Sequence, residues 1–64
     1  MESYEADVKA VLEKNGCSFA KRGQGDYDIW FSSHIGKHFP VDDIIKSRRH
    51  ANTIFRLSGV SHQL

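Results

Sequence analysis

Residues 21–31 read KRGQGDYDIWF, and this stretch decides how the rest of the chain is arranged. It opens with two cations, passes two glycines within three residues, and then enters an alternating run that starts at Tyr27. A glycine-rich turn followed by a period-two pattern is typical of a β-hairpin. Residues 17–22 and 26–32 are therefore expected to be antiparallel strands joined by a turn at residues 23–25.

The first expected strand carries two cations next to the turn. Regular alternation places Cys17 and Lys21 on one side of this strand and Arg22 on the other. A glycine-rich turn also lets a phosphate or another backbone come close. The hairpin is therefore the expected site of chemistry, with Tyr27 at its centre.

Two further segments have the apolar spacing of amphipathic helices. Residues 3–15 form the first, with Ser3 as the expected N-cap. Residues 47–58 form the second, with Ser47 as N-cap and Gly59 as the residue that closes the helix. In both helices, core packing is the expected use of the apolar stripe.

A third strand is expected at residues 37–41, with Phe39 facing inward and Pro40 at an edge. Residues 61–64 are expected to be a frayed tail. The order α-β-β-β-α predicts an α+β fold, in which two helices cover one face of a three-stranded antiparallel sheet. That is the core plan of double-stranded-RNA-binding-like domains, and residues 1–64 make one such domain.

Length and composition limit the class of protein. The chain has 64 residues, which allow one domain with a thin core, and its one cysteine rules out an internal disulfide. No apolar run reaches the roughly 18 residues that a membrane span needs, so a cytoplasmic protein is expected.

The net charge of +1 hides an asymmetry, because residues 44–64 contain four cations and no acid. One basic face would suit a polyanion, although a solvated helix face is the alternative.

Short motifs along nearly the whole chain match one known family in their order and at this chain length. They are KNG at 14–16, RGQGD at 22–26, IWF at 29–31, GKHFPV at 36–41, IKSR at 45–48, ANTIF at 51–55 and SGV at 58–60. The chain thus resembles HicA, the toxin of a bacterial toxin–antitoxin pair. This resemblance implies a double-stranded-RNA-binding-like fold, ribosome-independent cleavage of mRNA, and neutralisation in a complex with a HicB antitoxin. Any contact with operator DNA would come through that antitoxin.

One departure from the family concerns the catalytic position. The family carries a histidine shortly after the second glycine, and that histidine is taken to be catalytic. Here Gly25 and Asp26 are followed by Tyr27. A tyrosine, which ordinarily ionises near pH ~10, is a poor general base at neutral pH, whereas a histidine exchanges protons there. The departure predicts weak or absent nuclease activity in this chain.

Two explanations of Tyr27 stay open: a detoxified variant, and a natural member that lost or relocated its base. If the base is relocated, His38 on the next strand is the expected substitute, with His34 behind it. Packing on a cross-strand neighbour is the alternative role of Tyr27. Trp30 is expected in or beside the core.

The expected RNA contacts fall in two groups, with surface charge as the alternative in both. At the hairpin, Lys21 and Arg22 could hold phosphates, and Gly25 would allow close approach. At the start of the second helix, backbone N–H groups favour an anion. The cations expected to contact phosphate there are Lys46, Arg48 and Arg49, beside His50.

No cofactor and no metal site are expected. Asp26 and Asp28 lack an obvious third acid, and the four-residue spacing of His34 and His38 falls in a turn and strand. A rival function from another class is a non-catalytic module that binds structured RNA or a protein partner.

Overall fold

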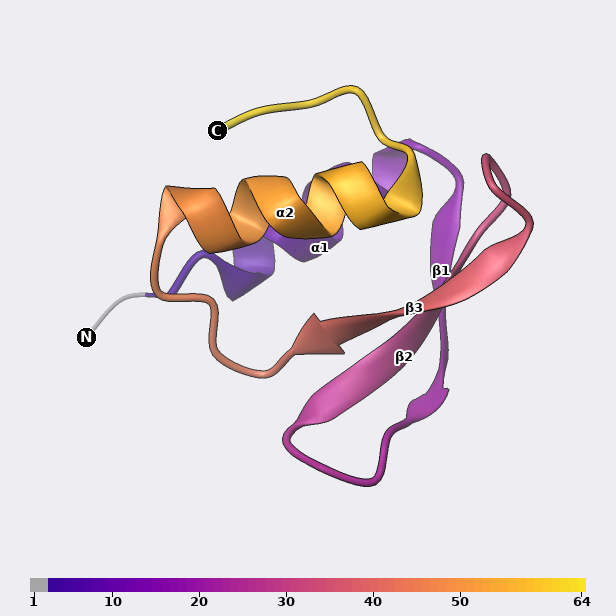
Figure 1. The fold of residues 1–64 in the computed structure, drawn as a ribbon, viewed down its shortest axis with the longest axis horizontal. Helices are drawn as coiled ribbons and strands as arrows, with labels where there is room; N and C mark the ends of the chain where they lie inside the picture. Colours follow the sequence, from indigo (N-terminus) through magenta and orange to yellow (C-terminus); the bar gives the residue numbers. More distant parts are fainter. Residues whose placement is uncertain (1–2) are drawn as a thin grey trace.

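The computed structural model describes residues 3–64, which form two helices and three strands (Figure 1). In chain order they are α1 (Glu5–Lys14), β1 (Cys17–Arg22), β2 (Tyr27–Ser32), β3 (Lys37–Asp42) and α2 (Arg48–Ser58). The strands make one antiparallel sheet in the order β1-β2-β3. Helices α1 and α2 lie side by side over one face of this sheet (Figure 1). The α+β architecture predicted from the sequence is confirmed.

Helix α1 begins differently from the prediction. Tyr4 is its N-cap residue and makes no side-chain capping bond. The Ser3 hydroxyl accepts hydrogen bonds from the backbone N–H groups of Glu5, at 3.2 Å, and of Ile45, at 3.0 Å. The prediction of Ser3 as N-cap is therefore wrong, because this hydroxyl joins the start of α1 to the connector that follows β3.

Strand β1 contains an irregularity that reverses the predicted facing of its last residues. The register with β2 shifts just before Lys21, which then pairs with Ile29, while Arg22 pairs with Asp28. A β-bulge adds one residue to a strand, so every side chain after it changes face. The expectation that Lys21 shares a side with Cys17 is wrong. Arg22 points to the side of the sheet that the two helices cover, and Lys21 points to the opposite side.

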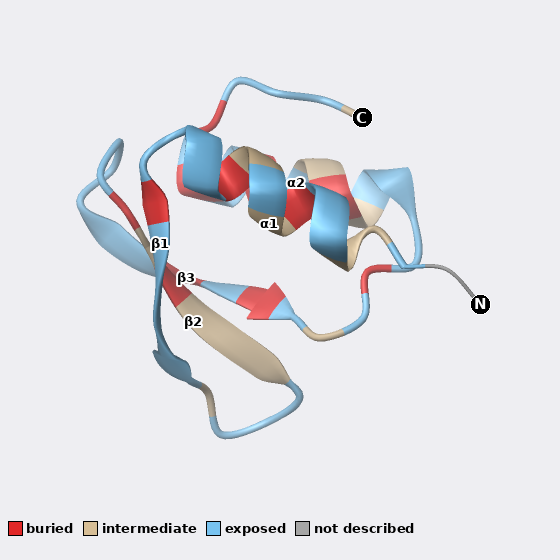
Figure 2. Cartoon of the chain, turned by 180° about the vertical axis from the view of Figure 1, so that it is seen from behind, coloured by how far each residue is buried: buried red, intermediate tan, exposed pale blue. Residues whose placement is uncertain are grey.

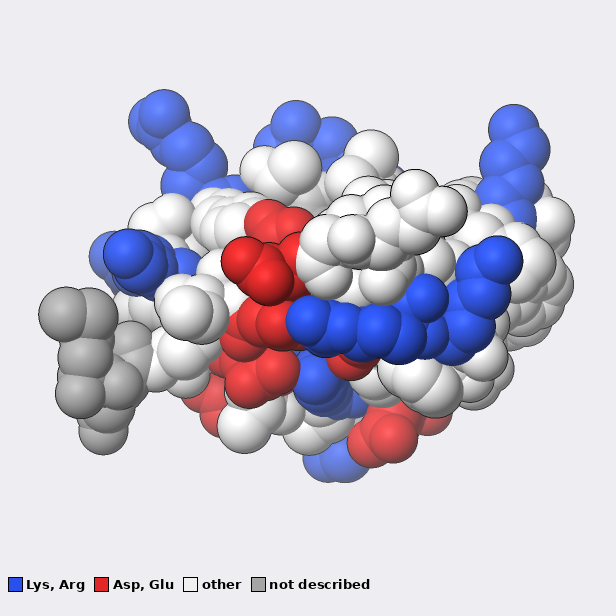
Figure 3. Space-filling model, turned by 90° about the horizontal axis from the view of Figure 1, so that it is seen from below, with Lys and Arg blue, Asp and Glu red and all other residues white. Residues whose placement is uncertain are grey.

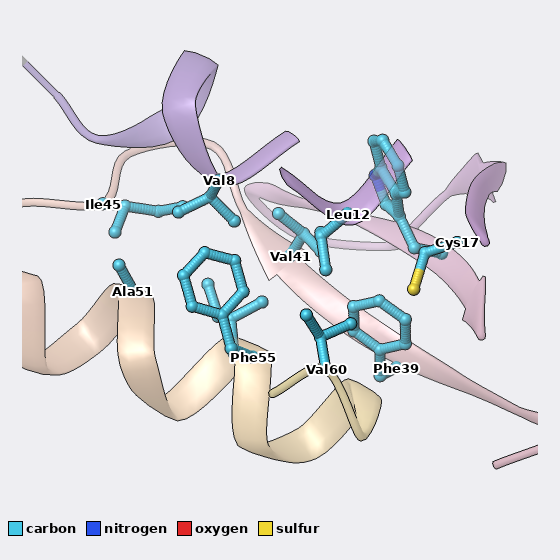
Figure 4. Packing of buried hydrophobic residues seen from close by; sticks show 11 residues of the cluster. Val8, Leu12, Cys17, Phe39, Val41, Ile45, Ala51, Phe55 and Val60 are labelled. Carbon is cyan, nitrogen blue, oxygen red and sulfur yellow. The ribbon is translucent and has the colours of Figure 1, made fainter. Parts of the chain in front are cut away.

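The core lies between the sheet and the two helices (Figures 2 and 4). Phe55 of α2 is only 1% exposed and packs among residues from α1 and β3. Burying one large apolar side chain contributes about 1.5–3 kcal/mol, so a core this small depends on each member. The buried apolar residues are Val8, Leu12, Cys17, Trp30, Phe39, Val41, Ile45, Ala51, Ile54, Phe55 and Val60.

Polar groups inside the core are few among the described residues. The Ser32 hydroxyl donates to the carbonyl of Ser58 at 2.6 Å, and the Ser58 hydroxyl donates to the carbonyl of Phe55 at 2.8 Å. The first bond joins the end of β2 to the last turn of α2, and the second lies within α2. Trp30 is 3% exposed, as predicted, and its indole N–H has no partner within residues 3–64.

Helix α2 begins and ends at the residues that the sequence predicts. The Ser47 hydroxyl accepts from the N–H of His50 at 3.1 Å, and Gly59 takes a left-handed conformation with φ of 77°. The tail is not frayed as predicted, because the N–H of Leu64 donates to the Asn52 side chain at 2.9 Å and Leu64 packs against the core. Within residues 3–64, neither helix is long and apolar enough to cross a lipid bilayer.

The second face of the sheet is covered by no helix of residues 3–64 (Figure 2). Tyr27, Ile29 and Phe31 of β2 point to this open face and are half-buried. The ring of His38 meets the ring of Phe31 edge-on, with centroids 5.2 Å apart. Pro40 lies on β3, which is an edge strand as predicted.

Substituting Phe55→Ala is expected to unfold most of the protein. Phe→Ala changes in a core cost about 3–5 kcal/mol, which is a large part of the stability of a small domain. Urea denaturation followed by far-ultraviolet circular dichroism measures the effect. Leu57, on the same helix and 50% exposed, provides the control: Leu57→Ala should change stability by less than about 0.5 kcal/mol. A Phe55→Ala midpoint equal to that of the unmodified chain would contradict this account of the core.

Candidate nucleic-acid interface

Tyr27 lies at the first position of β2, directly after the glycine turn. Its ring lies against that turn: a Cβ added at Gly23 would come within 2.3 Å of the ring, and one added at Gly25 within 3.2 Å. The N–H of Gly23 also donates to the carbonyl of Tyr27 at 3.0 Å. The sequence predicts that a phosphate or another backbone approaches these glycines, whereas the group that approaches them in the structure is the Tyr27 ring.

A shallow hollow separates the start of β2 from the connector that follows β3. Tyr27 and Lys46 both line it, so the structure brings together two of the residues singled out from the sequence. The N–H of Asp43 donates to the carbonyl of Asp26 at 3.0 Å, so two of the lining residues are joined through the backbone. The full lining is Asp26, Tyr27, Asp42, Asp43, Ile44 and Lys46.

Carboxylates dominate the charge of this hollow. Three of its lining residues are aspartates and one is a lysine. Figure 3 shows Asp and Glu side chains gathered at the centre of one face, with Lys and Arg around them. Each aspartate that is paired with a cation repels a bound phosphate less, so the partners of these carboxylates decide whether RNA can enter.

Arg22 supplies the cation for two carboxylates. Its guanidinium donates to Asp28 at 3.0 Å and to both oxygens of Asp43, at 2.5 and 2.7 Å. The hydrogen bonds from Arg22 lower the pKa of Asp43, and those same bonds raise the pKa of Arg22. The sequence predicts Arg22 as a phosphate ligand, whereas the structure places it in an ion-pair network that joins β1, β2 and the connector.

Lys21 is separated from Arg22 by the bulge. It points to the open face opposite Ile29, is exposed, and forms no ion pair within residues 3–64. The two neighbouring cations, which the sequence suggested would act together, therefore face opposite sides of the sheet.

The start of α2 carries the other predicted phosphate ligands. Arg48 and Arg49 are exposed in its first turn, which contains no acid, and Lys46 precedes the Ser47 cap. A helix N-terminus with added cations favours a bound anion. Lys46 also lines the Tyr27 hollow, so one member of the predicted α2 group lies beside Tyr27, whereas Lys21 and Arg22 of the predicted hairpin group are not part of that lining.

The histidines are distributed unevenly relative to Tyr27. His38 pairs with Phe31, four residues along β2 from Tyr27, which corresponds to about 13 Å of strand. The ring of His34 hydrogen-bonds the carbonyl of Asn15, beyond the same distant end of β2. The two predicted substitutes for the missing imidazole therefore lie away from Tyr27.

His50 lies at the Tyr27 end of the sheet. Its Nε2 is 2.7 Å from a carboxylate oxygen of Asp42, and Asp42 is the cross-strand partner of Tyr27. Sequence reasoning missed Asp42. The signal that could have found it is the strand register, in which a six-residue β3 pairs its last residue with the first residue of β2.

Other chemistry finds little support in the described residues. No three His, Cys, Asp or Glu side chains of residues 3–64 gather as a group that could hold a metal ion. Cys17 is buried in the core.

Comparison of the chain with protein-family models, curated proteins and solved structures finds no match.

Substituting Arg22→Gln is expected to lower the melting temperature at neutral pH and to flatten its acid dependence. An unfolded aspartate ionises near pH ~3.9, and Asp43 has a lower pKa in the folded chain. The pair therefore stabilises the fold above about pH 4, and this stabilisation is lost as pH falls through the folded-state pKa. Because the pair is exposed, the effect should be small.

Thermal melts between about pH 2 and pH 7 measure this dependence. Lys21→Gln removes the neighbouring charge without removing an ion pair seen in residues 3–64, and serves as the matched control. If Arg22→Gln loses as much stability on acidification as Lys21→Gln and the unmodified chain do, the Arg22 ion pairs do not contribute to the acid dependence of stability.

Proposed function

We propose that this protein is the scaffold of an mRNA-cleaving toxin that binds RNA at the Tyr27 end of the sheet. The observation that carries the proposal is that Tyr27 and Lys46 line one hollow beside the basic start of α2. The ordered motifs that resemble the HicA family support the same function. The toxin would act in the cytoplasm, where its mRNA substrate is found.

RNA phosphates would contact the cations at this end. Lys46, Arg48 and Arg49 are exposed and follow one another around the α2 N-terminus. Lys21 adds a free cation on the open face, whereas Arg22 serves to neutralise Asp28 and Asp43. Such contacts fix position and supply affinity without reading sequence.

Cleavage would use the RNA's own 2′-hydroxyl as nucleophile. The protein must then accept a proton from this hydroxyl and return one to the departing 5′-oxygen. Tyr27 occupies the position of the family's catalytic histidine but cannot exchange protons as an imidazole does near neutral pH. The chain as it stands is therefore an attenuated or inactive nuclease.

The proposed protein partner is an antitoxin of the HicB kind, bound in a hetero-oligomer. Half-buried apolar side chains of β2 and the exposed Pro40 of β3 offer it a surface on the open face. Acidic groups of such a partner would match Lys21 and the α2 cations. Operator DNA would be reached only through the antitoxin.

A second candidate function is a binding module without catalysis. It is favoured by the three carboxylates around Tyr27 and by the absence of an imidazole from the lining of that hollow. Such a module would bind structured RNA, or chiefly a protein partner, and Tyr27 would then pack on the hairpin alone.

RNA binding by Arg48 and Arg49 can be measured through its salt dependence. Replacing either with Gln should weaken binding to every RNA sequence and lower the slope of log K against log salt by about 1. Fluorescence anisotropy with a labelled mRNA fragment provides the measurement. Lys37 pairs with Ser32 at the far end of the sheet, so Lys37→Gln should leave the slope unchanged. Equal slopes for all variants would remove the α2 start from the interface.

Restoring an imidazole by Tyr27→His should create or increase RNA cleavage. A positioned general base contributes about 10²–10⁴-fold to a rate, and the assay should succeed in EDTA because no metal is used. Gel analysis of a labelled mRNA measures the rate, and Tyr27→Phe serves as the control that should not cut faster. If Tyr27→His cuts no faster than the unmodified chain, the non-catalytic module is the better account.

A further inference from the structure

An imidazole held by a carboxylate lies at the end of the sheet where Tyr27 begins β2. His50 Nε2 and Asp42 Oδ2 are 2.7 Å apart, and Asp42 stands directly across from Tyr27 in the strand register. Residues paired in this way have Cα atoms about 4.5–5.5 Å apart. Asp42 is therefore a direct neighbour of both position 27 and the imidazole.

The backbone fixes both members of this pair. The N–H of His50 donates to the Ser47 hydroxyl at 3.1 Å, which holds His50 in the first turn of α2. Asp42 is the last residue of β3 and lines the Tyr27 hollow with Lys46. The side chain of His50 is 35% exposed and lies outside the lining of the hollow, so a substrate would reach it by extending past Asp42, which belongs to that lining.

Orientation by Asp42 prepares the ring for proton transfer. The Asp42 carboxylate faces Nε2 across the 2.7 Å ion pair, which favours the tautomer with the proton on Nε2 and leaves the lone pair of a neutral ring on Nδ1. No group of residues 3–64 forms a hydrogen bond to Nδ1. A base that is itself oriented by a third group is the usual arrangement for activating a hydroxyl nucleophile.

We propose that His50 is the general base for RNA cleavage at this site, and that Asp42 is the residue that positions it. This inference rests on the proposed function and identifies the second proton-transfer group of the same site. Position 27 and His50 would then act on opposite sides of the scissile phosphate, which Lys46 and the α2 N-terminus hold. Tyr27 replaces only the imidazole that the family resemblance implies at position 27, and the imidazole of His50 remains.

The step balances without a cofactor. Nδ1 of His50 takes the proton of the ribose 2′-hydroxyl, and the 2′-oxygen forms a bond to the adjacent phosphorus. The bond from phosphorus to the 5′-oxygen breaks, and that oxygen receives a proton from an imidazole at position 27 or, in this chain, from water. The products are a 2′,3′-cyclic phosphate and a 5′-hydroxyl, and His50 then releases its proton to solvent.

A structural role of the pair must be separated from this catalytic one. The ion pair between His50 and Asp42 also links α2 to β3, so its loss could lower stability. Rates are therefore compared in the Tyr27→His background, where the proposed function gives measurable cleavage. The variants are Tyr27→His alone and the same chain with His50→Gln, Asp42→Asn or His38→Gln, each checked by thermal melting and by RNA affinity.

The substrate is a short RNA cut in EDTA, beside a copy with 2′-deoxyribose at the cleavage site. His50→Gln should lower the cleavage rate by about 10²–10⁴-fold while RNA affinity stays unchanged. Asp42→Asn should lower the maximal rate less, again without loss of affinity. His38→Gln should change nothing, and the deoxy copy should not be cut.

The other possible outcomes test the assignment of His50 separately from the proposed function. If Tyr27→His cuts RNA and the added His50→Gln cuts equally fast, the assignment of His50 is overturned and the proposed function stands. If Tyr27→His neither binds nor cuts RNA, the proposed function fails and the assignment fails with it. If His50→Gln unfolds the chain, Asp42→Asn decides; unfolding of both variants would make the pair structural and overturn the assignment.

Discussion

The whole fold depends on burying one face of a three-stranded sheet under two short helices. The described residues form a single cluster of eleven buried apolar side chains, so little is left over to stabilise any other arrangement. Both helices are used on the same face, and this leaves the opposite face of β2 open (Figure 2). Within residues 3–64 the sheet therefore keeps one face and the ends of its strands free of helix cover, and the proposed site lies at one of these ends.

Charge at one end of the sheet is organised by a single inserted residue. The bulge in β1 sends Arg22 to the helix side, where it meets Asp28 and Asp43, and sends Lys21 to the open side. Without the bulge, Arg22 would point to the open side, and Asp28 and Asp43 would lack their guanidinium partner. Asp28 would keep only its 3.6 Å ion pair with Lys9, and Asp43 would have no cation partner among residues 3–64, so the bulge links a local backbone irregularity to the charge that a bound polyanion would meet.

The same end of the sheet gathers groups from three separate segments: Tyr27 from β2, Asp42 from β3, and Lys46 and His50 around the start of α2. None of these is unusual alone. Under the proposed function, this meeting would supply cations for phosphate, a hollow for a nucleotide and an imidazole for proton transfer. A substitution at position 27 would change one component of this site and leave the others intact.

The sequence by itself determined the order of elements, the inward-facing Phe39 and Trp30, the Ser47 cap and the Gly59 closure, because these follow from local periodicity and backbone preference. It failed at Ser3, whose hydroxyl bonds a residue 42 positions away, and at the tail, where Leu64 packs on the core. The partners of Arg22 and the pairing of Asp42 with His50 were decided only by the tertiary structure. Bulge position and strand register join residues distant in sequence, and local pattern does not encode either.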